Sequence, residues 1–253
     1  MSDLLINNKL VLLDVEAIIF DKDGTLIDVH HYWSSMLEIR AGFIVDKYNL
    51  NDKVKFELMD AMGVDIKSGK IKTDGPVGIK PRSFIVSVAV EVLNSNNISI
   101  SNTDIESIFL EVDRKTSDNI LPLLKLLPDV GRLLENLKQC GVTIMLATTD
   151  MTSRARLAMK ALGIEHFFSE IIGGDAVEFS KPSPDLALNI IEKSKVNKDK
   201  IVVIGDHPVD VKMGSAANVA CNIGVLTGLS NADLFSELDC FGVESLEDIG
   251  VKC

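Results

Sequence analysis

The chain has 253 residues, of which 46% are hydrophobic and 25% charged, and its formal net charge is -11 with a pI near 4.8. This composition is typical of a globular protein with one large domain, or with a core and an insertion. The negative charge disfavours nucleic acid and anionic membranes as main partners, because neither attracts an acidic protein. No apolar run reaches the roughly 18 residues of a membrane span, and charges interrupt residues 1–16, where a signal peptide would stand. We therefore expect a cytoplasmic protein.

Five short apolar runs are typical of buried strands in a parallel sheet, because their apolar residues do not alternate with polar ones. They are AIIF (17–20), VTIMLAT (142–148), EII (170–172), KIVVIGD (200–206) and NIGVL (222–226). Helical patterns lie among the later runs, at residues 129–141, 153–163 and 183–195. This alternation predicts an α/β fold with a doubly wound, Rossmann-like parallel sheet.

Residues 30–120 have a different pattern. Amphipathic helices are predicted there for residues 32–50, 52–63, 81–96 and 102–120, and no segment has the pattern of a strand. We therefore predict an all-helical domain at residues 30–120, inserted into a core domain that consists of residues 1–29 and 121–253.

The four cysteines, Cys140, Cys221, Cys240 and Cys253, form no CxxC pair and have no metal-ligand spacing. In a cytoplasmic protein this pattern predicts reduced thiols.

Polar side chains follow three of the predicted strands. The segments are DKDGT (21–25), TTD (148–150) and GDHPVD (205–210), and SKPSPD brings Lys181 to a turn before a helix. Because the carboxyl ends of parallel strands meet at one edge of a sheet, we expect these side chains to line one crevice. Carboxylates suit Mg²⁺, whereas hydroxyls, backbone N–H groups and a lysine suit a phosphate.

In this order, the four segments resemble the motifs of the haloacid dehalogenase (HAD) superfamily, in the phosphoglycolate phosphatase-like branch that carries a helical cap. DKDGT matches the DxDGT motif, Thr148 the strand-end serine or threonine, Lys181 the motif lysine, and GDHPVD the GDxxxD motif. The match spans nearly the whole chain. It implies a Mg²⁺-dependent phosphatase that hydrolyses a small phosphorylated metabolite through an aspartyl-phosphate intermediate, with residues 30–120 as the cap.

The two aspartates of the first motif have separate expected roles. Asp21 is the candidate nucleophile, because a carboxylate that attacks phosphorus forms a reactive acyl phosphate. Asp23 could reach the ester oxygen, protonate the leaving group and later deprotonate the attacking water. The resemblance further implies that Asp21, the backbone carbonyl of Asp23, and Asp206 hold the Mg²⁺ ion. Lys22 is expected to point away from both aspartates.

The remaining motif residues are expected to bind the phosphate or to support the site. The resemblance implies that Thr148, the backbone N–H of Thr149 and Lys181 hold phosphate oxygens. Gly24 allows a turn that a side chain could hinder. Asp210 is expected to orient Lys181 or a metal-bound water, and the alternative for this residue is a charge at a helix N-terminus.

The inserted segment is expected to select the substrate. At its start, residues 30–33 (HHYW) leave two alternatives open: a substrate contact, or packing of Trp33 beside an exposed histidine. The loop of residues 68–83 could bring Lys80 or Arg82 to a carboxylate or a second phosphate of the substrate. A solvated loop is the alternative.

Two other functions stay open. A phosphomutase of the β-phosphoglucomutase kind also keeps both Asp21 and Asp23, whereas the dehalogenases and phosphonate-cleaving enzymes that the chain resembles replace the second aspartate. A binding module without catalysis is the further alternative. The sequence identifies neither the substrate nor the oligomeric state.

Overall fold

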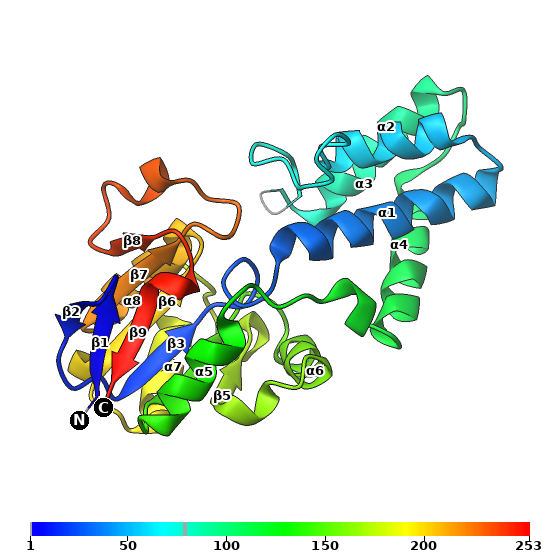
Figure 1. Cartoon of the computed structure of the whole chain (residues 1–253). Helices are drawn as coiled ribbons and strands as arrows, with labels where there is room; N and C mark the ends of the chain where they lie inside the picture. Colours follow the sequence, from blue (N-terminus) through cyan, green and yellow to red (C-terminus); the bar gives the residue numbers. More distant parts are fainter. Residues whose placement is uncertain (1, 78–79) are drawn as a thin grey trace. The chain divides into compact units, whose positions relative to one another are not determined.

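The computed structural model describes residues 2–77 and 80–253, and the chain divides into two compact units (Figure 1). The core unit comprises Met1–Asp28 and Lys125–Cys253, and the helical unit comprises Val29–Leu124. The helical unit extends past residues 30 and 120 because its first helix begins at Val29 and a short 3₁₀ helix, Leu121–Leu123, follows its last.

A six-stranded parallel sheet forms the centre of the core unit, with the strand order β5-β4-β3-β6-β7-β8. The strands are β3 (Ala17–Phe20), β4 (Thr143–Ala147), β5 (Phe168–Ile172), β6 (Ile201–Gly205), β7 (Cys221–Val225) and β8 (Phe241–Val243). The five predicted strands are confirmed. The sixth, β8, was not predicted, because it has only three residues and two of them are exposed.

Helices cover the sheet on both faces. Ala17 and Ile19 of β3 pack with residues of α7 and α8 in one buried cluster. Ile18 and Phe20 point to the opposite face, as alternation in a strand requires, and they are also fully buried. The core helices are α5 (Val130–Gln139), α6 (Thr152–Ala161), α7 (Asp185–Ser194) and α8 (Pro208–Ala217). The predicted doubly wound α/β fold is therefore confirmed.

A second, antiparallel sheet joins the two ends of the chain and was not predicted. It consists of β1 (Asp3–Ile6), β2 (Lys9–Leu12) and β9 (Ile249–Lys252), in the order β2-β1-β9. Asn7 and Asn8 connect the first two strands, and both have positive φ angles. Two successive residues with positive φ are what a tight hairpin turn needs, and asparagine tolerates that conformation.

The prediction that all four cysteines are reduced is wrong for one pair. Cys140, at the end of α5, and Cys253, after β9, form a disulfide, whereas Cys221 and Cys240 are free. The bonded cysteines are separated by 113 positions in the sequence. The two cysteines meet because β9, at the end of the chain, packs against α5. The spacing of the cysteines in the sequence does not reveal this contact.

The helical unit contains the four predicted helices. Two of them have side-chain caps at their N-termini: Asn51 accepts a hydrogen bond from the backbone N–H of Val54, and Ser101 forms a capping box with Asp104. In the described residues, no helix is both long and apolar enough to cross a membrane. The helices are α1 (Val29–Tyr48), α2 (Asp52–Met62), α3 (Arg82–Ser95) and α4 (Asn102–Ser117).

Candidate active site

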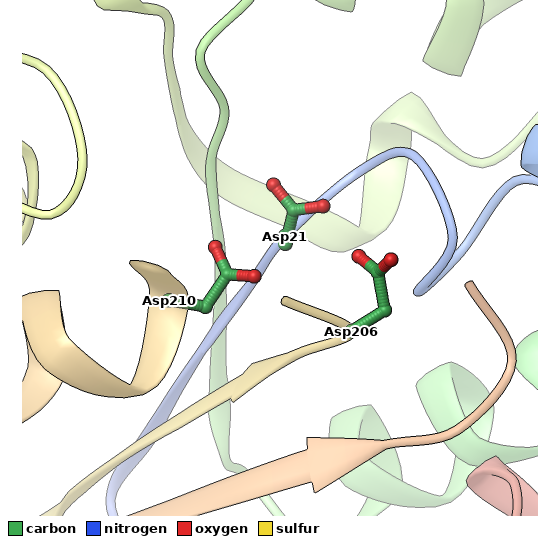
Figure 2. Close-up of side chains that lie close together, drawn as sticks. All are labelled: Asp21, Asp206 and Asp210. Carbon is green, nitrogen blue, oxygen red and sulfur yellow. The ribbon is translucent and has the colours of Figure 1, made fainter. Parts of the chain in front are cut away.

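Three aspartates meet at the carboxyl edge of the parallel sheet (Figure 2). Asp21 follows β3 and Asp206 follows β6, and these two strands are neighbours. Asp210 lies in the first turn of α8, the helix that follows β6. Each aspartate offers a carboxylate oxygen, and these oxygens lie within 4.8 Å of one another. The order of the strands thus brings together side chains that are almost 190 positions apart.

Lys181 places a positive charge between two of these aspartates. Its Nζ donates hydrogen bonds to Oδ1 of Asp21 at 2.5 Å and to Oδ1 of Asp210 at 2.6 Å. The side chain is 1% exposed. Burial disfavours the charged ammonium, but the two carboxylates outweigh burial and raise the pKa of Lys181. The lysine is therefore held in its charged form.

Asp210 both orients this lysine and begins a helix. Its Oδ1 binds Lys181, and its Oδ2 accepts a hydrogen bond from the backbone N–H of His207, which completes a capping box on α8. Gly205 lies against this side chain, where an added Cβ would overlap with the Asp210 carboxyl. One oxygen of Asp210 thus contacts Lys181, as the first alternative predicted. The other oxygen caps helix α8, as the second alternative predicted.

Asp206 is enclosed mainly by backbone. It is 6% exposed, and Thr25 Oγ1 lies 3.5 Å from its Oδ1. A Cβ at Gly24 or at Gly228 would overlap with its carboxylate, and Gly24 also has a φ of +86°. Glycine is thus needed at position 24 for both space and conformation. Burial, with the charges of Asp21 and Asp210, raises the pKa of Asp206 well above its ordinary value.

This donor set fits a hard divalent cation. Lys181 bonds to Asp21 and Asp210, whereas Asp206 forms no ion pair with a lysine or arginine among the described residues. A positive ion beside Asp206 would relieve the repulsion that raises its pKa. Carboxylate oxygens are ligands that Mg²⁺ binds in proteins. The cluster can therefore hold a metal ion.

Asp23 lies outside the cluster of three carboxylates. Its Oδ2 is 3.1 Å from Nζ of Lys22, and its side chain is partly exposed. Burial raises the pKa of Asp23; Lys22 opposes this effect and the negative charge of Asp21 adds to it. A raised pKa favours the protonated carboxyl, which is the form that can donate a proton.

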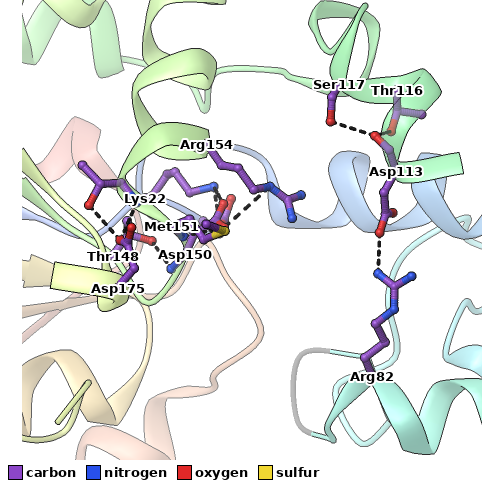
Figure 3. Close-up of polar contacts among 12 residues, drawn as sticks. Lys22, Arg82, Asp113, Thr116, Ser117, Thr148, Asp150, Met151, Arg154 and Asp175 are labelled. Atoms are coloured by element: carbon purple, nitrogen blue, oxygen red, sulfur yellow. Dashed lines mark hydrogen bonds and ion pairs between the residues drawn. The ribbon is translucent and has the colours of Figure 1, made fainter. Parts of the chain in front are cut away.

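The expectation that Lys22 points away from the aspartates is wrong. Its Nζ lies 2.9 Å from Oδ2 of Asp150 (Figure 3). The same Nζ lies 3.1 Å from Oδ2 of Asp23. The physical reason is that β3 ends at Phe20 and a turn follows, in which the Lys22 carbonyl accepts hydrogen bonds from Leu26 and Ile27. The alternation of side chains along a strand therefore does not apply at position 22. Although burial opposes the charge, Asp23 and Asp150 raise the pKa of Lys22.

Thr148 and Thr149 follow β4, the neighbour of β3. Phe20 is paired with Leu146, so Thr148 is beside the turn that begins at Asp21. Thr148 is buried, and its Oγ1 accepts a hydrogen bond from the backbone N–H of Asp150 at 3.1 Å. Thr149 is exposed. The structure thus brings the predicted phosphate-binding segment to the same sheet edge as the aspartates.

Sequence reasoning gave no role to three residues at this edge, although Asp150 belongs to the TTD segment that was expected there. Asp150 pairs with Lys22, as described above. Thr227 Oγ1 donates a hydrogen bond to the Gly24 carbonyl at 2.6 Å, and Gly228 makes room for Asp206. Thr227 and Gly228 follow β7, and this position at a strand end was the available signal.

In the helical unit, Arg82 is engaged by acidic side chains. It forms ion pairs with Asp113 (Figure 3) and with Glu106, at 2.7 Å for the latter. Asp113 also binds Arg40 at 2.9 Å. These contacts favour a structural role for Arg82 over the predicted substrate contact. Lys80 lies 6.0 Å from the ring of Phe84, and residues 78–79 of the predicted loop lie outside the described residues.

At the start of α1, the HHYW segment contributes to the packing of the helical unit. Tyr32 is buried and meets Trp33 edge to face, with 5.2 Å between the ring centroids. His31 Nε2 lies 3.2 Å from the Pro122 carbonyl. The packing alternative for Trp33 therefore has contacts in the structure.

Known proteins with this fold and these motifs identify the family. A profile of haloacid dehalogenase-like hydrolases matches residues 15–218, so the chain belongs to this family, as its motifs predicted. It is 24% identical over 237 residues to a phosphorylated carbohydrates phosphatase from Thermotoga maritima, and the aligned region covers 93% of this chain and 96% of that protein. It is 27% identical over 223 residues to a phosphoglycolate phosphatase from Aliivibrio fischeri, 85% of each chain. A crystal structure of a candidate beta-phosphoglucomutase from Thermotoga maritima has a TM-score of 0.68 at 22% identity and covers 92% of this chain and 95% of its own.

Proposed function

We propose that the protein is a Mg²⁺-dependent phosphatase that hydrolyses a small phosphomonoester through an aspartyl-phosphate on Asp21. The observation that carries this proposal is the bond between Lys181 Nζ and Asp21 Oδ1, which fixes the carboxylate at the sheet edge. The names of the relatives supply the substrate class, since one acts on phosphorylated carbohydrates and another on phosphoglycolate. The substrate expected here is a small phosphorylated metabolite of that kind.

Asp21 would act as the nucleophile in the first half of the reaction. Its Oδ1 is bonded to Lys181, so Oδ2 is the oxygen that would attack phosphorus. The bond from phosphorus to the ester oxygen breaks as the new bond to Asp21 forms, and the Asp23 carboxyl gives its proton to the leaving oxygen. The raised pKa of Asp23 favours this protonated starting form.

A water molecule would complete the reaction. It attacks the phosphorus of the aspartyl-phosphate while the Asp23 carboxylate removes its proton, and inorganic phosphate and free Asp21 result. Lys181, the Thr148 hydroxyl and the Thr149 backbone N–H would bind the non-bridging oxygens. Asp21, Asp206 and the backbone carbonyl of Asp23 would hold Mg²⁺, whose charge offsets the repulsion between these carboxylates and a phosphate dianion.

The helical unit would act as the cap that selects the leaving group. It joins the core unit at only two points of the chain, Asp28–Val29 and Leu124–Lys125. On the core side these two connections are paired, because the backbone N–H of Asp28 donates to the Lys125 carbonyl at 2.8 Å. Two adjacent connections would allow the helical unit to move as one body relative to the core unit.

The proposal is tested by a screen for phosphate release with Mg²⁺ over phosphoglycolate, hexose phosphates and nucleotides. We expect release from at least one small ester, and none from the Asp21→Asn variant. A hexose 1-phosphate with its bisphosphate tests the phosphomutase alternative, because a mutase forms the isomer in place of free phosphate. Isomer without phosphate, or no turnover of any ester, would overturn the proposal.

A further inference from the structure

Lys22 links the turn after β3 to the loop after β4. Its Nζ lies 3.1 Å from Asp23 Oδ2 and 2.9 Å from Asp150 Oδ2, and the residue is only 4% exposed. A lysine ammonium has three donors, and desolvating it is unfavourable unless acidic partners are present. Its two contacts therefore bind together two loops that lie 128 positions apart.

Asp150, which contacts Lys22 from the loop after β4, is fixed by hydrogen bonds of its own. Its Oδ1 accepts a hydrogen bond from the backbone N–H of Met151 at 2.8 Å, and its own N–H donates to Thr148 Oγ1 (Figure 3). Nε of Arg154, in the first turn of α6, lies 3.7 Å from the same carboxylate. Asp150, just before α6, therefore fixes the position of the Lys22 ammonium. The ammonium in turn contacts the carboxylate of Asp23.

We propose that Lys22 is a positioning residue that aims the Asp23 carboxyl at the leaving oxygen of the ester. This inference rests on the proposed function, because it assigns a task to Lys22 only if Asp23 is the acid and base. Asp23 Oδ2 is bonded to Lys22, so Oδ1 is the oxygen presented to the substrate. Without Lys22, the Asp23 carboxyl can rotate, and the repulsion between Asp23 and Asp150 is no longer offset.

The test uses the dependence on the leaving group. An alkyl ester such as glycerol phosphate needs a proton from Asp23, whereas p-nitrophenyl phosphate releases an anion that is stable without one. In the Lys22→Met variant we expect kcat/KM for the alkyl ester to fall at least about 10-fold more than for the p-nitrophenyl ester, because acid catalysis contributes about 10²-fold to 10⁴-fold. Lys22→Arg keeps the positive charge and can donate to both carboxylates, so the extra loss for the alkyl ester should be smaller in this variant.

Lys200→Met is the matched control. Lys200 also bridges two carboxylates, those of Asp14 and Glu16, both at 2.6 Å. Glu16 precedes β3, so this bridge is at the opposite end of the sheet from the site. We expect the control to leave the ratio of the two esters unchanged. If Lys22→Met does not fold, as judged by circular dichroism, Asp150→Ala replaces it, because it removes the anchor that holds the ammonium and should shift the ratio in the same direction.

An equal loss for both esters in a folded variant would overturn the inference, since Lys22 would then only support the loops. An unchanged profile would overturn it as well. If the wild-type protein released phosphate from no ester of the screen, these two included, the proposed function itself would fail, which separates the two outcomes.

Discussion

Lys181 Nζ lies 2.5 Å from Asp21 Oδ1, so the candidate nucleophile is paired with a fixed positive charge before any substrate binds. The same ammonium lies 2.6 Å from Asp210 Oδ1, and the lysine is almost fully buried. A buried cation shared by two carboxylates stabilises the fold only while all three groups are present. The site is therefore expected to influence stability as well as catalysis.

Replacement of Lys181 by methionine should reduce both turnover and stability. The variant leaves Asp21 and Asp210 without their shared cation, and breaking such a buried pair costs about 3–5 kcal/mol. Thermal unfolding in EDTA measures this loss, and Mg²⁺ should restore part of it. Lys212→Met, at an exposed position of the same helix α8, is the control and should unfold like the wild type. Unchanged stability of Lys181→Met would contradict the role given to this ion pair.

Mg²⁺ should stabilise the wild type through Asp206. A ligand at 100 times its Kd stabilises a folded protein by about 2.7 kcal/mol, and calorimetry or thermal unfolding can detect this change. The Asp206→Asn variant should lose both the stabilisation and the activity. Ca²⁺ should support little turnover, because its larger and more variable shell misplaces the reacting oxygens. An equal response of wild type and variant to Mg²⁺ would place the metal elsewhere.

Without metal, Asp206 should make stability depend on pH. Its raised pKa means that the folded state keeps a proton that the unfolded state has released. Between the unfolded pKa of about 3.9 and the raised folded pKa, the stability from this group therefore falls as the pH rises. Asp206→Asn has no such proton, so its free energy of unfolding should increase relative to the wild type over this range. Denaturant unfolding in EDTA at several pH values measures the difference, and a constant difference would contradict the prediction.

Reduction of the Cys140–Cys253 disulfide should destabilise the core unit. The bond spans 113 positions, and closing a loop of that length contributes about 2–5 kcal/mol through the entropy of the unfolded chain. For a protein of this size, the loss corresponds to a decrease in Tm of about 5–15 °C. The Cys253→Ser variant should match the reduced wild type and should not respond to a reductant. Equal Tm values for oxidised and reduced wild type would contradict this prediction.

The parallel sheet could be predicted because each central strand is a continuous apolar run. Ala17–Phe20 is buried on both faces, and this is visible in the sequence without any knowledge of its neighbours. The antiparallel sheet escaped prediction because its four-residue strands come from opposite ends of the chain. The Asn7-Asn8 turn was its one local signal.

The site was predictable where polar residues directly follow a strand, as Asp21 and Asp206 do. It was not predictable where a long-range partner decides the direction of a side chain. Lys22 is buried because Asp150 lies across from it, and nothing within the DKDGT segment reveals that partner. The disulfide of Cys140 escaped prediction for the same reason.

The central claim is that Asp21 carries the phosphoryl group during turnover. The most direct measurement is acid quenching of the wild-type protein during steady-state hydrolysis of its best ester with Mg²⁺, followed by mass spectrometry of the peptides. We predict a phosphoryl group on the peptide with Asp21, and no such adduct in a folded Asp21→Asn variant. A phosphoryl group on another residue, or hydrolysis by Asp21→Asn at the wild-type rate, would contradict the claim.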